Sequence, residues 1–543
     1  MQQIVFVADF FLEQGLGGGA ERCNEVLIDD FSKNGCGVTK VNCHLLRPDQ
    51  INPNDYYIVA NFMNLSEECK VALKTVRYLI IEHDHKYVST NDPSKFVNML
   101  APFRYIINKD FFANAEAVCC QSKLHSQALQ KNLLINNIVN LGGNLWSDEN
   151  LDLLESLIDS PKRRKNAIMY SLNKNKGMFY TQEYCKKNHV DFEIIKATEY
   201  ETFIKELAAT ERLFFFPQWL ESFNRVVIEA RILGCKLTTN KLIGATSEPW
   251  FKKYEGRPLI GFLREKKKEI FNVYTSIINK EPVTFIPPIP LPTISIITSL
   301  YKGGKFIEHF MEEVTSQTIF PQCELLILDA NSPDNEYNVI KKYCEKYPNI
   351  VYQRLADTPS VQETMNIAIE QAKGEILTLW NVDDSRRSDA LEVLAKHLVV
   401  DPTVHLVYAD CYQTSKMNES FKNNSRGGIL YEHSRYDFSK ENMIKCLPGP
   451  MPMWKKELNK TCGLFDKALT FAGDWELWLR CVEAGLKFKK VPEVLGLYYF
   501  NPAGLSTSEE YQSQRFTEEK MIFHKYGHLF GQETYNKYKG YFK

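Results

Sequence analysis

The sequence predicts an α/β protein built on parallel, doubly wound sheets. Apolar runs with the composition of buried strands alternate with segments of helical periodicity, first over residues 1–280 and again after residue 292. A proline-rich stretch separates the two series. Because ligands of such sheets bind where the strands end, side chains that follow strands are the first candidates for a functional site.

Size and composition bound the class of protein. The chain has 543 residues, which exceeds what one hydrophobic core normally supports, so several domains are expected. Hydrophobic residues make up 44% and charged residues 24%, as in ordinary globular proteins. The net charge of -1 provides no field that would attract nucleic acid, which is therefore a disfavoured partner.

Several features favour a cytoplasmic protein. The 14 cysteines lack the spacing of a zinc site, which favours reduced thiols. The amino terminus enters a strand at once instead of forming a signal peptide, and no apolar run reaches the roughly 18 residues of a transmembrane segment. Basic runs at residues 162–165 and 264–268 leave peripheral association with the inner face of a membrane open.

The first half predicts two Rossmann-like lobes with a cleft between them. Residues 1–160 would form the amino-terminal lobe and residues 161–280 the carboxyl-terminal lobe, with a hinge in the polar stretch at 160–165. The expected strands lie at residues 4–8, 57–60, 78–81, 115–120, 167–170 and 212–216. The expected helices lie at residues 20–33, 124–131 and 224–233.

A linker and a third domain are expected next. Five prolines within residues 282–292 exclude helix, so residues 281–292 predict an extended connector. Residues 293–543 would form the third domain. Its expected strands lie at residues 293–298, 324–329, 350–354 and 375–379, and its expected helices at residues 305–315, 336–347 and 361–372.

The most informative motif follows the apolar run at residues 375–379. Residues 381–384 read Asn-Val-Asp-Asp, and a carboxylate at the end of a buried strand can hold a divalent cation against a diphosphate. The same pair is also ordinary composition for a turn or a helix cap. By itself, the motif indicates either nucleotide-sugar chemistry or a plain turn.

Residues 293 to about 510 resemble glycosyltransferase family 2, which has the GT-A fold. The resemblance is carried in order by the first strand and turn at 294–301, the strand ending Leu-Asp-Ala-Asn-Ser at 328–332, and the run at 381–384. It implies a nucleotide-sugar donor held by the following residues: Tyr301, Asp329, Asn381, Asp383 and Asp384. Asp383 takes the position of the ligand for Mg²⁺ or Mn²⁺, and Asn381 replaces the family's first acid with an amide that can bond a ribose hydroxyl.

Residues 472–480 resemble the helix that carries the general base of this family. The resemblance implies that Asp474 deprotonates the acceptor hydroxyl, and direct attack would invert the anomeric centre. Asp474 is also a natural helix cap, and Glu476 is a competing base on another face. Trp475 and Trp478 are candidates for sugar platforms or for core packing. The histidine that many relatives carry is absent from residues 499–506.

Residues 1–280 resemble, more weakly, glycosyltransferase family 4, which has the GT-B fold. The resemblance rests on Gly-Gly-Gly-Ala-Glu-Arg at 17–22 and on two glutamates, Glu221 and Glu229, that follow a strand. It implies that Gly18 and Gly19 let the backbone approach donor or acceptor, that Glu221 lies near the donor sugar, and that Glu229 binds the ribose. Lys176 would face the diphosphate, but the arginine expected upstream is missing. The His-Asp-His run at 83–85 either lines the cleft or forms a surface loop.

Together these features predict a bifunctional glycosyltransferase. It would transfer sugars from nucleotide-sugar donors to a glycan or glycolipid acceptor of polysaccharide, capsule or lipopolysaccharide type. The GT-A site would invert and the GT-B-like site would retain configuration. Three alternatives stay open: only the GT-A domain is catalytic and the first half binds the acceptor, the whole chain is a noncatalytic scaffold, or the acceptor is modified DNA or protein.

Overall fold

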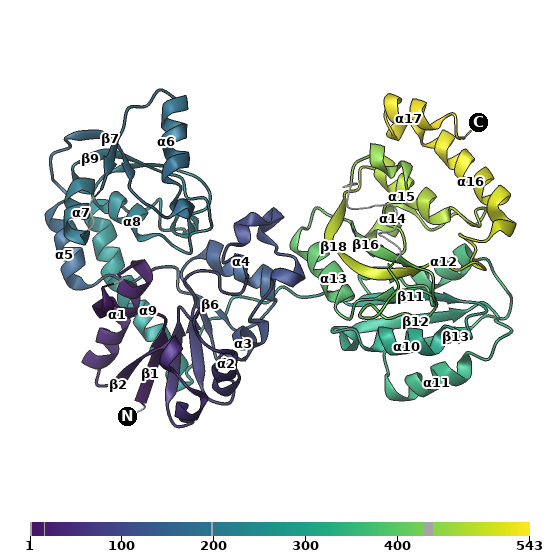
Figure 1. Ribbon diagram of the computed structural model, residues 1–543, viewed down its shortest axis with the longest axis horizontal. Helices are drawn as coiled ribbons and strands as arrows, with labels where there is room; N and C mark the ends of the chain where they lie inside the picture. The colour runs from purple at the N-terminus through teal and green to yellow at the C-terminus, as the bar shows by residue number, and fades with distance from the viewer. Residues whose placement is uncertain (1–2, 16, 197–198, 427–437, 543) are drawn as a thin grey trace. The chain divides into compact units, whose positions relative to one another are not determined.

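The computed structural model describes residues 3–15, 17–196, 199–426 and 438–542. They form two compact units, residues 1–289 and residues 290–543, each with its own sheets and cores (Figure 1). The boundary between the units falls inside the proline-rich segment that was expected to be a linker. The predicted α/β fold class is confirmed.

A six-stranded parallel sheet forms the first part of unit 1, in the order β2-β1-β3-β4-β5-β6. Its strands are β1 (Gln3–Ala8), β2 (Gly37–Asn42), β3 (Tyr56–Ala60), β4 (Tyr78–Ile81), β5 (Val118–Cys120) and β6 (Ile138–Asn140). Alternate strand residues face opposite sides. One face packs on α1 (Gly19–Lys33) and α9 (Gly256–Asn279). The other packs on α2 (Glu67–Leu73), α3 (Lys109–Asn114) and α4 (Lys123–Leu133).

A four-stranded parallel sheet forms the second part of unit 1, in the order β10-β9-β7-β8. Its strands are β7 (Arg164–Met169), β8 (Glu193–Ile195), β9 (Thr210–Phe215) and β10 (Lys236–Thr239). One face is covered by α5 (Asp148–Ser156), α7 (Tyr200–Ala208) and α8 (Arg225–Ile232). The other face packs on α6 (Met178–Lys187). The division of unit 1 into a GT-B-like pair of lobes stays a prediction.

Helix α9, which the sequence reasoning missed, joins both parts of unit 1. Its first turns place Leu259 and Leu263 in the core of the four-stranded sheet, and its later turns place Ile270 and Tyr274 against the six-stranded sheet. The basic run at 264–268 lies on this helix and forms ion pairs with acidic groups nearby, such as Arg264 with Asp152 at 2.6 Å and Lys267 with Asp30 at 3.5 Å.

The first part of the proline-rich segment lies on unit 1. The Ile286 amide donates to the carbonyl of Ile138 at 2.8 Å, and the Gln130 side chain donates to the carbonyl of Pro287. These bonds attach the segment beside β6. The prediction of an extended chain without helix agrees with the absence of any helix between residues 280 and 293, all of which the structure describes.

Unit 2 contains one eight-stranded sheet in the order β13-β12-β11-β14-β17-β16-β18-β15. Its strands are β11 (Ile294–Leu300), β12 (Cys323–Asp329), β13 (Ile350–Arg354), β14 (Ile376–Leu379), β15 (Ser385–Arg386), β16 (Leu406–Thr414), β17 (Met453–Lys455) and β18 (Phe488–Tyr499). The expectation of a parallel sheet holds for β11 to β14 and for the pair of β16 and β18, and it is wrong for the other pairs. Strand β17 runs antiparallel to both β14 and β16, and β15 runs antiparallel to β18.

Helices pack on both faces of this sheet (Figure 1), and each face has its own hydrophobic core. One contains α10 (Ile307–Thr315), α11 (Tyr337–Lys346) and α13 (Ala390–Val400). The other contains α12 (Val361–Gln371), α14 (Glu457–Cys462), α15 (Gly473–Glu483) and α16 (Gln512–Lys525), with α17 (Gln532–Tyr538) packed against it. Neighbouring strand residues such as Ile296 and Ile297 belong to opposite cores, which is the two-residue period of a strand buried on both faces.

Candidate active site

The parallel register of unit 2 gathers the predicted donor residues at one edge of its sheet. Strand β11 pairs in parallel with both β12 and β14, so the three strands end on the same side. Tyr301 follows β11 and is 46% exposed, Asp329 is the last residue of β12, and Asn381 and Asp383 come just after β14. The candidate site therefore lies on this edge.

Asp329 is buried and fully engaged at the end of β12. It is only 1% exposed, and one oxygen accepts the amide of Ser332 at 2.7 Å. The other oxygen accepts the Tyr352 hydroxyl at 2.6 Å and the Arg354 guanidinium at 3.0 Å. Arg354, which Asp329 holds in place, is therefore the side chain that reaches solvent at the end of β12. Sequence reasoning missed this arginine.

Asp383 offers a half-buried carboxylate to the same edge. One of its oxygens accepts the side-chain amide of Asn501 at 3.2 Å, and Asn501 belongs to the segment where the histidine is absent. Burial raises the pKa of Asp383 above its ordinary value, and the Asn501 bond opposes that shift. This residue can therefore ionise more readily once a cation lies beside it.

The oxygens at this edge fit a magnesium- or manganese-type site. Among the described residues, no group of three or more His, Cys, Asp or Glu side chains could enclose a metal ion. Mg²⁺ does not need such a cage, because it usually binds one or two carboxylates together with substrate phosphates and water. Asp383 is the residue here that would contact the ion.

Asp384 points into the protein instead of toward the edge. It is buried, and in the described part of the chain its Oδ1 atom has no hydrogen-bond partner. Burial raises its pKa well above the ordinary value, and the neighbouring Asp383 adds to the shift. The Asn381 amide lies 3.4 Å from its Oδ2 atom. Asp384 therefore stabilises the turn at residues 381–384 from its buried side. Its predicted contact with the donor stays a prediction.

Asp474 lies in the first turn of α15. Its Oδ1 accepts the amide of Trp475 at 2.7 Å, and the Cys446 thiol lies 3.5 Å from Oδ2. Burial raises the pKa of Asp474, and these two donors oppose the shift. A carboxylate with a raised pKa is better matched to accepting a proton from a hydroxyl than an ordinary aspartate.

Glu476, the competing base, is structural. Its carboxylate accepts the Arg480 guanidinium at 2.6 Å and the Tyr526 hydroxyl at 2.7 Å, and Lys525 donates at 2.9 Å. Burial alone would raise its pKa, but these donors lower it below the ordinary value. Trp475 and Trp478 are both buried in the core, which excludes the sugar-platform role for either of them in this conformation.

Arg515 on α16 is a further charged group that sequence reasoning missed. Its charge acts on the Tyr498 hydroxyl and on Glu519. Tyr498 also responds to Asp383, and Glu519 responds to Asp474, so Arg515 connects the surroundings of the two carboxylates electrostatically. The spacing of Arg515 and Glu519, four residues apart on a helix, was the available sequence signal.

In unit 1 the structure brings Lys176 and Glu221 together. The ammonium lies 2.8 Å and 3.0 Å from the two carboxylate oxygens. The Trp219 indole donates to the same carboxylate at 2.6 Å, and Asn224 donates at 3.1 Å. Glu221 is therefore a positioned carboxylate at the start of α8, with a cation beside it.

Glu229 lies on the buried side of α8. Its Oε1 accepts the Trp146 indole at 3.1 Å and the Tyr200 hydroxyl at 2.9 Å. A ribose could reach this carboxylate only if Tyr200 moved. The predicted ribose contact of Glu229 therefore stays a prediction that this conformation does not display.

Gly18 and Gly19 begin α1, where the Gly18 amide donates to the Glu21 carboxylate at 2.9 Å. Arg225 of α8 approaches this turn, because its Cδ would lie 3.4 Å from a Cβ added at Gly19. The arginine is 7% exposed, its guanidinium stacks 4.4 Å over the Trp146 ring, and its Nη2 has no hydrogen-bond partner among the described residues. Sequence reasoning sought an arginine upstream of Lys176, whereas the fold supplies one from downstream.

His83 and His85 are neither exposed cleft lining nor surface loop. Both are buried, and burial lowers the pKa of each to about 4. His83 lies 2.9 Å from Asn24, and His85 lies 3.1 Å from the carbonyl of Leu220 on the other lobe. The neutral His85 ring therefore helps to join the two parts of unit 1.

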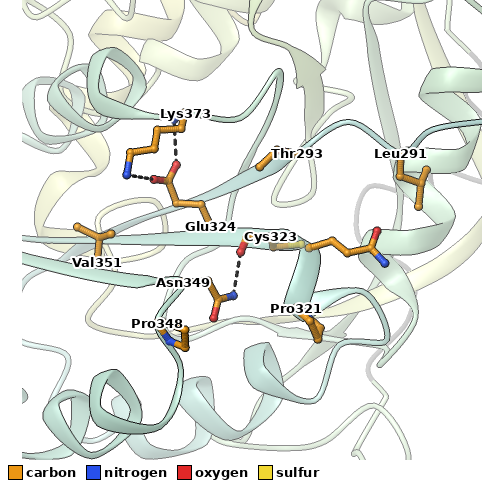
Figure 2. Close-up of a pocket in the computed structure, with 10 residues that line it drawn as sticks. Leu291, Thr293, Pro321, Cys323, Glu324, Pro348, Asn349, Val351 and Lys373 are labelled. Carbon is orange, nitrogen blue, oxygen red and sulfur yellow. Dashed lines mark hydrogen bonds and ion pairs between the residues drawn. The ribbon is translucent and has the colours of Figure 1, made fainter.

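A hollow of about 490 Å³ lies at the opposite end of the unit 2 strands (Figure 2). It opens where β12 and β13 begin. Figure 2 shows that its polar groups bond to each other, with Asn349 donating to the carbonyl of Cys323 at 2.8 Å and the Lys373 amide donating to Glu324 at 2.9 Å. None of the predicted site residues lines it. In the described part of the chain, no helix is long and apolar enough to cross a membrane.

Comparison with known proteins finds a family match within unit 2. Residues 295–463 match the family described as Glycosyl transferase family 2. The glycosyltransferase AglE of Haloferax volcanii is 23% identical over 222 residues, 39% of this chain and 69% of that protein. The uncharacterized glycosyltransferase MJ1057 of Methanocaldococcus jannaschii is 21% identical over 208 residues, 38% of this chain and 70% of that protein. Chondroitin synthase of Pasteurella multocida is 24% identical over 208 residues, but the match spans only 20% of its length.

Two solved structures resemble part of the chain at low similarity. Staphylococcus aureus TarS 1–349 in complex with UDP has a TM-score of 0.35 and 16% identity, covering 43% of this chain and 65% of that one. The mannosyltransferase PcManGT of Pyrobaculum calidifontis, in complex with GDP-Man and Mn²⁺, has a TM-score of 0.35 and 19% identity, covering 47% and 70%. With both scores below 0.5, the assignment rests on the family match.

The match to Glycosyl transferase family 2 therefore lies in unit 2. The protein is an enzyme, a glycosyltransferase that uses nucleotide-sugar donors. The family match lies wholly within unit 2, so the family 4 resemblance of unit 1 stays a prediction.

Replacing Glu476 with Gln should destabilise unit 2. The variant loses charge-assisted bonds from Arg480 and Tyr526, so the free energy of unfolding should fall by about 2 kcal/mol near neutral pH. Because the folded-state pKa lies below the ordinary 4.5, this contribution is present above that value and is lost as the pH falls through the folded-state pKa. Denaturant unfolding at about pH 7 and about pH 3 measures both effects. The exposed Glu533→Gln on α17 is the control, and an equal loss at both pH values would contradict the account.

Proposed function

We propose that unit 2 transfers a sugar with inversion and that Asp474 is its general base. The observation that carries this proposal is the presence in unit 2 of two separate carboxylates on different elements. Asp383 follows β14 at the donor edge, and Asp474 lies in the first turn of α15. One carboxylate can face the diphosphate while the other faces the acceptor, as a single displacement requires.

Donor binding is assigned to the edge formed by β11, β12 and β14. In the proposal, Tyr301 and the Asp329–Arg354 pair contact the nucleoside, Asn381 bonds a ribose hydroxyl, and Asp383 faces the diphosphate. Asp384 belongs to this set through its support of the Asn381 side chain. When bound, Mg²⁺ or Mn²⁺ would neutralise charge that develops on the leaving diphosphate.

The acceptor is proposed to be a growing glycan or a glycolipid. The names of two relatives, chondroitin synthase and hyaluronan synthase, refer to polysaccharides, which supports this class. In the reaction, Asp474 takes the proton of the acceptor hydroxyl, the oxygen attacks the anomeric carbon, and the nucleoside diphosphate leaves from the opposite face. Modified DNA or protein is the alternative acceptor.

Unit 1 is proposed to hold a second donor site, which would make the enzyme bifunctional. The positioned Lys176–Glu221 pair supports this assignment, with Arg225 near the Gly18–Gly19 turn as a second cation for a diphosphate. Family 4 chemistry would retain configuration there. The competing proposal is that only unit 2 is catalytic and unit 1 binds the acceptor. It is favoured because Trp146 and Tyr200 already occupy the Glu229 carboxylate that would bind the ribose.

The variant Asp474→Asn should lower the transfer rate by about 10²- to 10⁴-fold, because the amide cannot accept the proton. Release of UDP or GDP from UDP-N-acetylglucosamine, UDP-glucose and GDP-mannose, with candidate glycan acceptors, measures the rate. In the wild type, activity should fall as acidification protonates Asp474, beginning above the ordinary aspartate range because burial raises its pKa. Asp466→Asn, at an exposed position in the preceding loop, is the control. A wild-type transfer rate in Asp474→Asn would contradict the assignment of Asp474 as the general base.

The variant Glu221→Gln tests unit 1. Calorimetric titration with UDP and GDP should show two binding sites in the wild type, and the variant should weaken one of them by about tenfold, the usual effect of about 1.4 kcal/mol. Glu211→Gln, at an exposed position on β9, is the matched control. If Glu221→Gln alters neither nucleotide binding nor any transfer step, unit 1 is not a working transferase and the acceptor-binding role gains support.

A further inference from the structure

The helix that carries Asp474 begins without a cap of its own. Ala472 occupies the N-cap position of α15 and has no side-chain oxygen to accept the first backbone N–H groups. The position of its first turn therefore depends on what holds the backbone that leads into it. Asp474 lies in the first turn, so any shift of that backbone would move its carboxylate directly.

Glu518 of α16, from a distant part of the sequence, binds the three backbone N–H groups that lead into the helix. Its Oε1 accepts the amide of Thr470 at 2.7 Å. Its Oε2 accepts the amides of Phe471 at 2.8 Å and Ala472 at 2.9 Å. Three consecutive N–H groups thus point at one carboxylate, and a negative charge at a helix start is further stabilised by the helix dipole.

The same short segment is held from the other side by α12. Gln362 is buried, and its side-chain amide donates to the carbonyl of Thr470 at 3.0 Å. A Cβ on Gly473 would lie only 3.0 Å from the Gln362 side chain, which explains the glycine at the helix start. The Thr470 residue is therefore fixed through both its amide, by Glu518, and its carbonyl, by Gln362.

Helix α16 does not depend on Glu518 for its own attachment. The hydroxyl of Tyr526, directly after α16, donates to Glu476 of α15 at 2.7 Å, and Ile522 and Phe523 of α16 are buried in the core. A substitution at Glu518 should therefore leave α16 docked. A Glu518 variant can therefore report on the three amide bonds without a general loss of stability in unit 2.

We propose that Glu518 is a positioning residue for the base Asp474: by binding the three amides before α15, it fixes where the Asp474 carboxylate points. The inference rests on the proposed role of Asp474. Asp474 contacts the acceptor, whereas Glu518 acts only through the backbone of residues 470–472. It also assigns a role to the carboxyl-terminal helices, which lie outside the matched family region at residues 295–463.

The bonds themselves can be tested without knowing the substrates. Hydrogen exchange of the full-length protein should show protected amides at residues 470–472, and Glu518→Gln should speed their exchange by about tenfold or more, while the interior of α15 stays protected. Glu510→Gln, at an exposed position just before α16, is the matched control. Unchanged exchange of the three amides in Glu518→Gln would overturn the proposal.

The consequence for the reaction is tested with the donor of the panel above that gives the highest rate. Glu518→Gln should lower kcat by about 10- to 100-fold, since small misplacements of a reacting group have effects of that size. The KM for the donor should change less than about twofold, because the donor edge is untouched.

A double variant separates this inference from the base assignment. If Glu518 acts through Asp474, the Asp474→Asn/Glu518→Gln protein should be no slower than Asp474→Asn alone. A further loss in the double variant would show that Glu518 acts elsewhere, which overturns the inference. An inactive Asp474→Asn beside a fully active Glu518→Gln overturns only the inference, whereas a fully active Asp474→Asn overturns the proposed base.

Discussion

The parallel pairing of β11 with both β12 and β14 is the constraint on which the unit 2 site depends. It makes three strands end at one edge, so that Asp329, Asn381 and Asp383 meet although more than 50 residues separate the first from the last. Each strand is buried on both faces, so a slip in register would disrupt two cores at once. The packing of apolar residues therefore fixes the geometry of the polar ones.

The surroundings of the proposed base are built differently. Asp474 comes from a helix, not from a strand end, and the start of that helix is held by partners on α12 and α16. The buried Glu476 network then fastens α15 to α16. The proposed base is positioned by hydrogen bonds and the proposed donor edge by a sheet, so the two can be altered separately by substitution.

Buried strands and the helices between them were predictable from sequence, because a buried parallel strand is a short, almost wholly apolar run. Helix α9 was missed because Leu259 and Leu263 face one core while Ile270 and Tyr274 face another, so no single stripe marks it. The antiparallel strands were missed because β17 has three residues and follows no crossover helix. Whether such a short segment forms a strand depends on the neighbouring strands with which it pairs. The local sequence pattern does not identify those strands.

The site residues divide in a similar way. The positions of Asp383 and Asp474 followed from motifs, but the state of Asp329, Asp384 and Glu229 did not, because it depends on donors from other elements. Arg354, Glu518 and the unit 1 arginine Arg225 could not be predicted for the same reason. Their roles arise from three-dimensional neighbours that lie far away in the sequence.

The central claim is that Asp383 faces a metal-bound diphosphate while Asp474 serves the acceptor. Titration of the full-length protein with Mn²⁺ in the presence of UDP or GDP, followed by electron paramagnetic resonance, tests it most directly. The account predicts that bound Mn²⁺ depends on the nucleoside diphosphate, that Asp383→Asn weakens this binding by about tenfold or more, and that Asp474→Asn leaves it unchanged. Wild-type Mn²⁺ binding by Asp383→Asn would contradict the account.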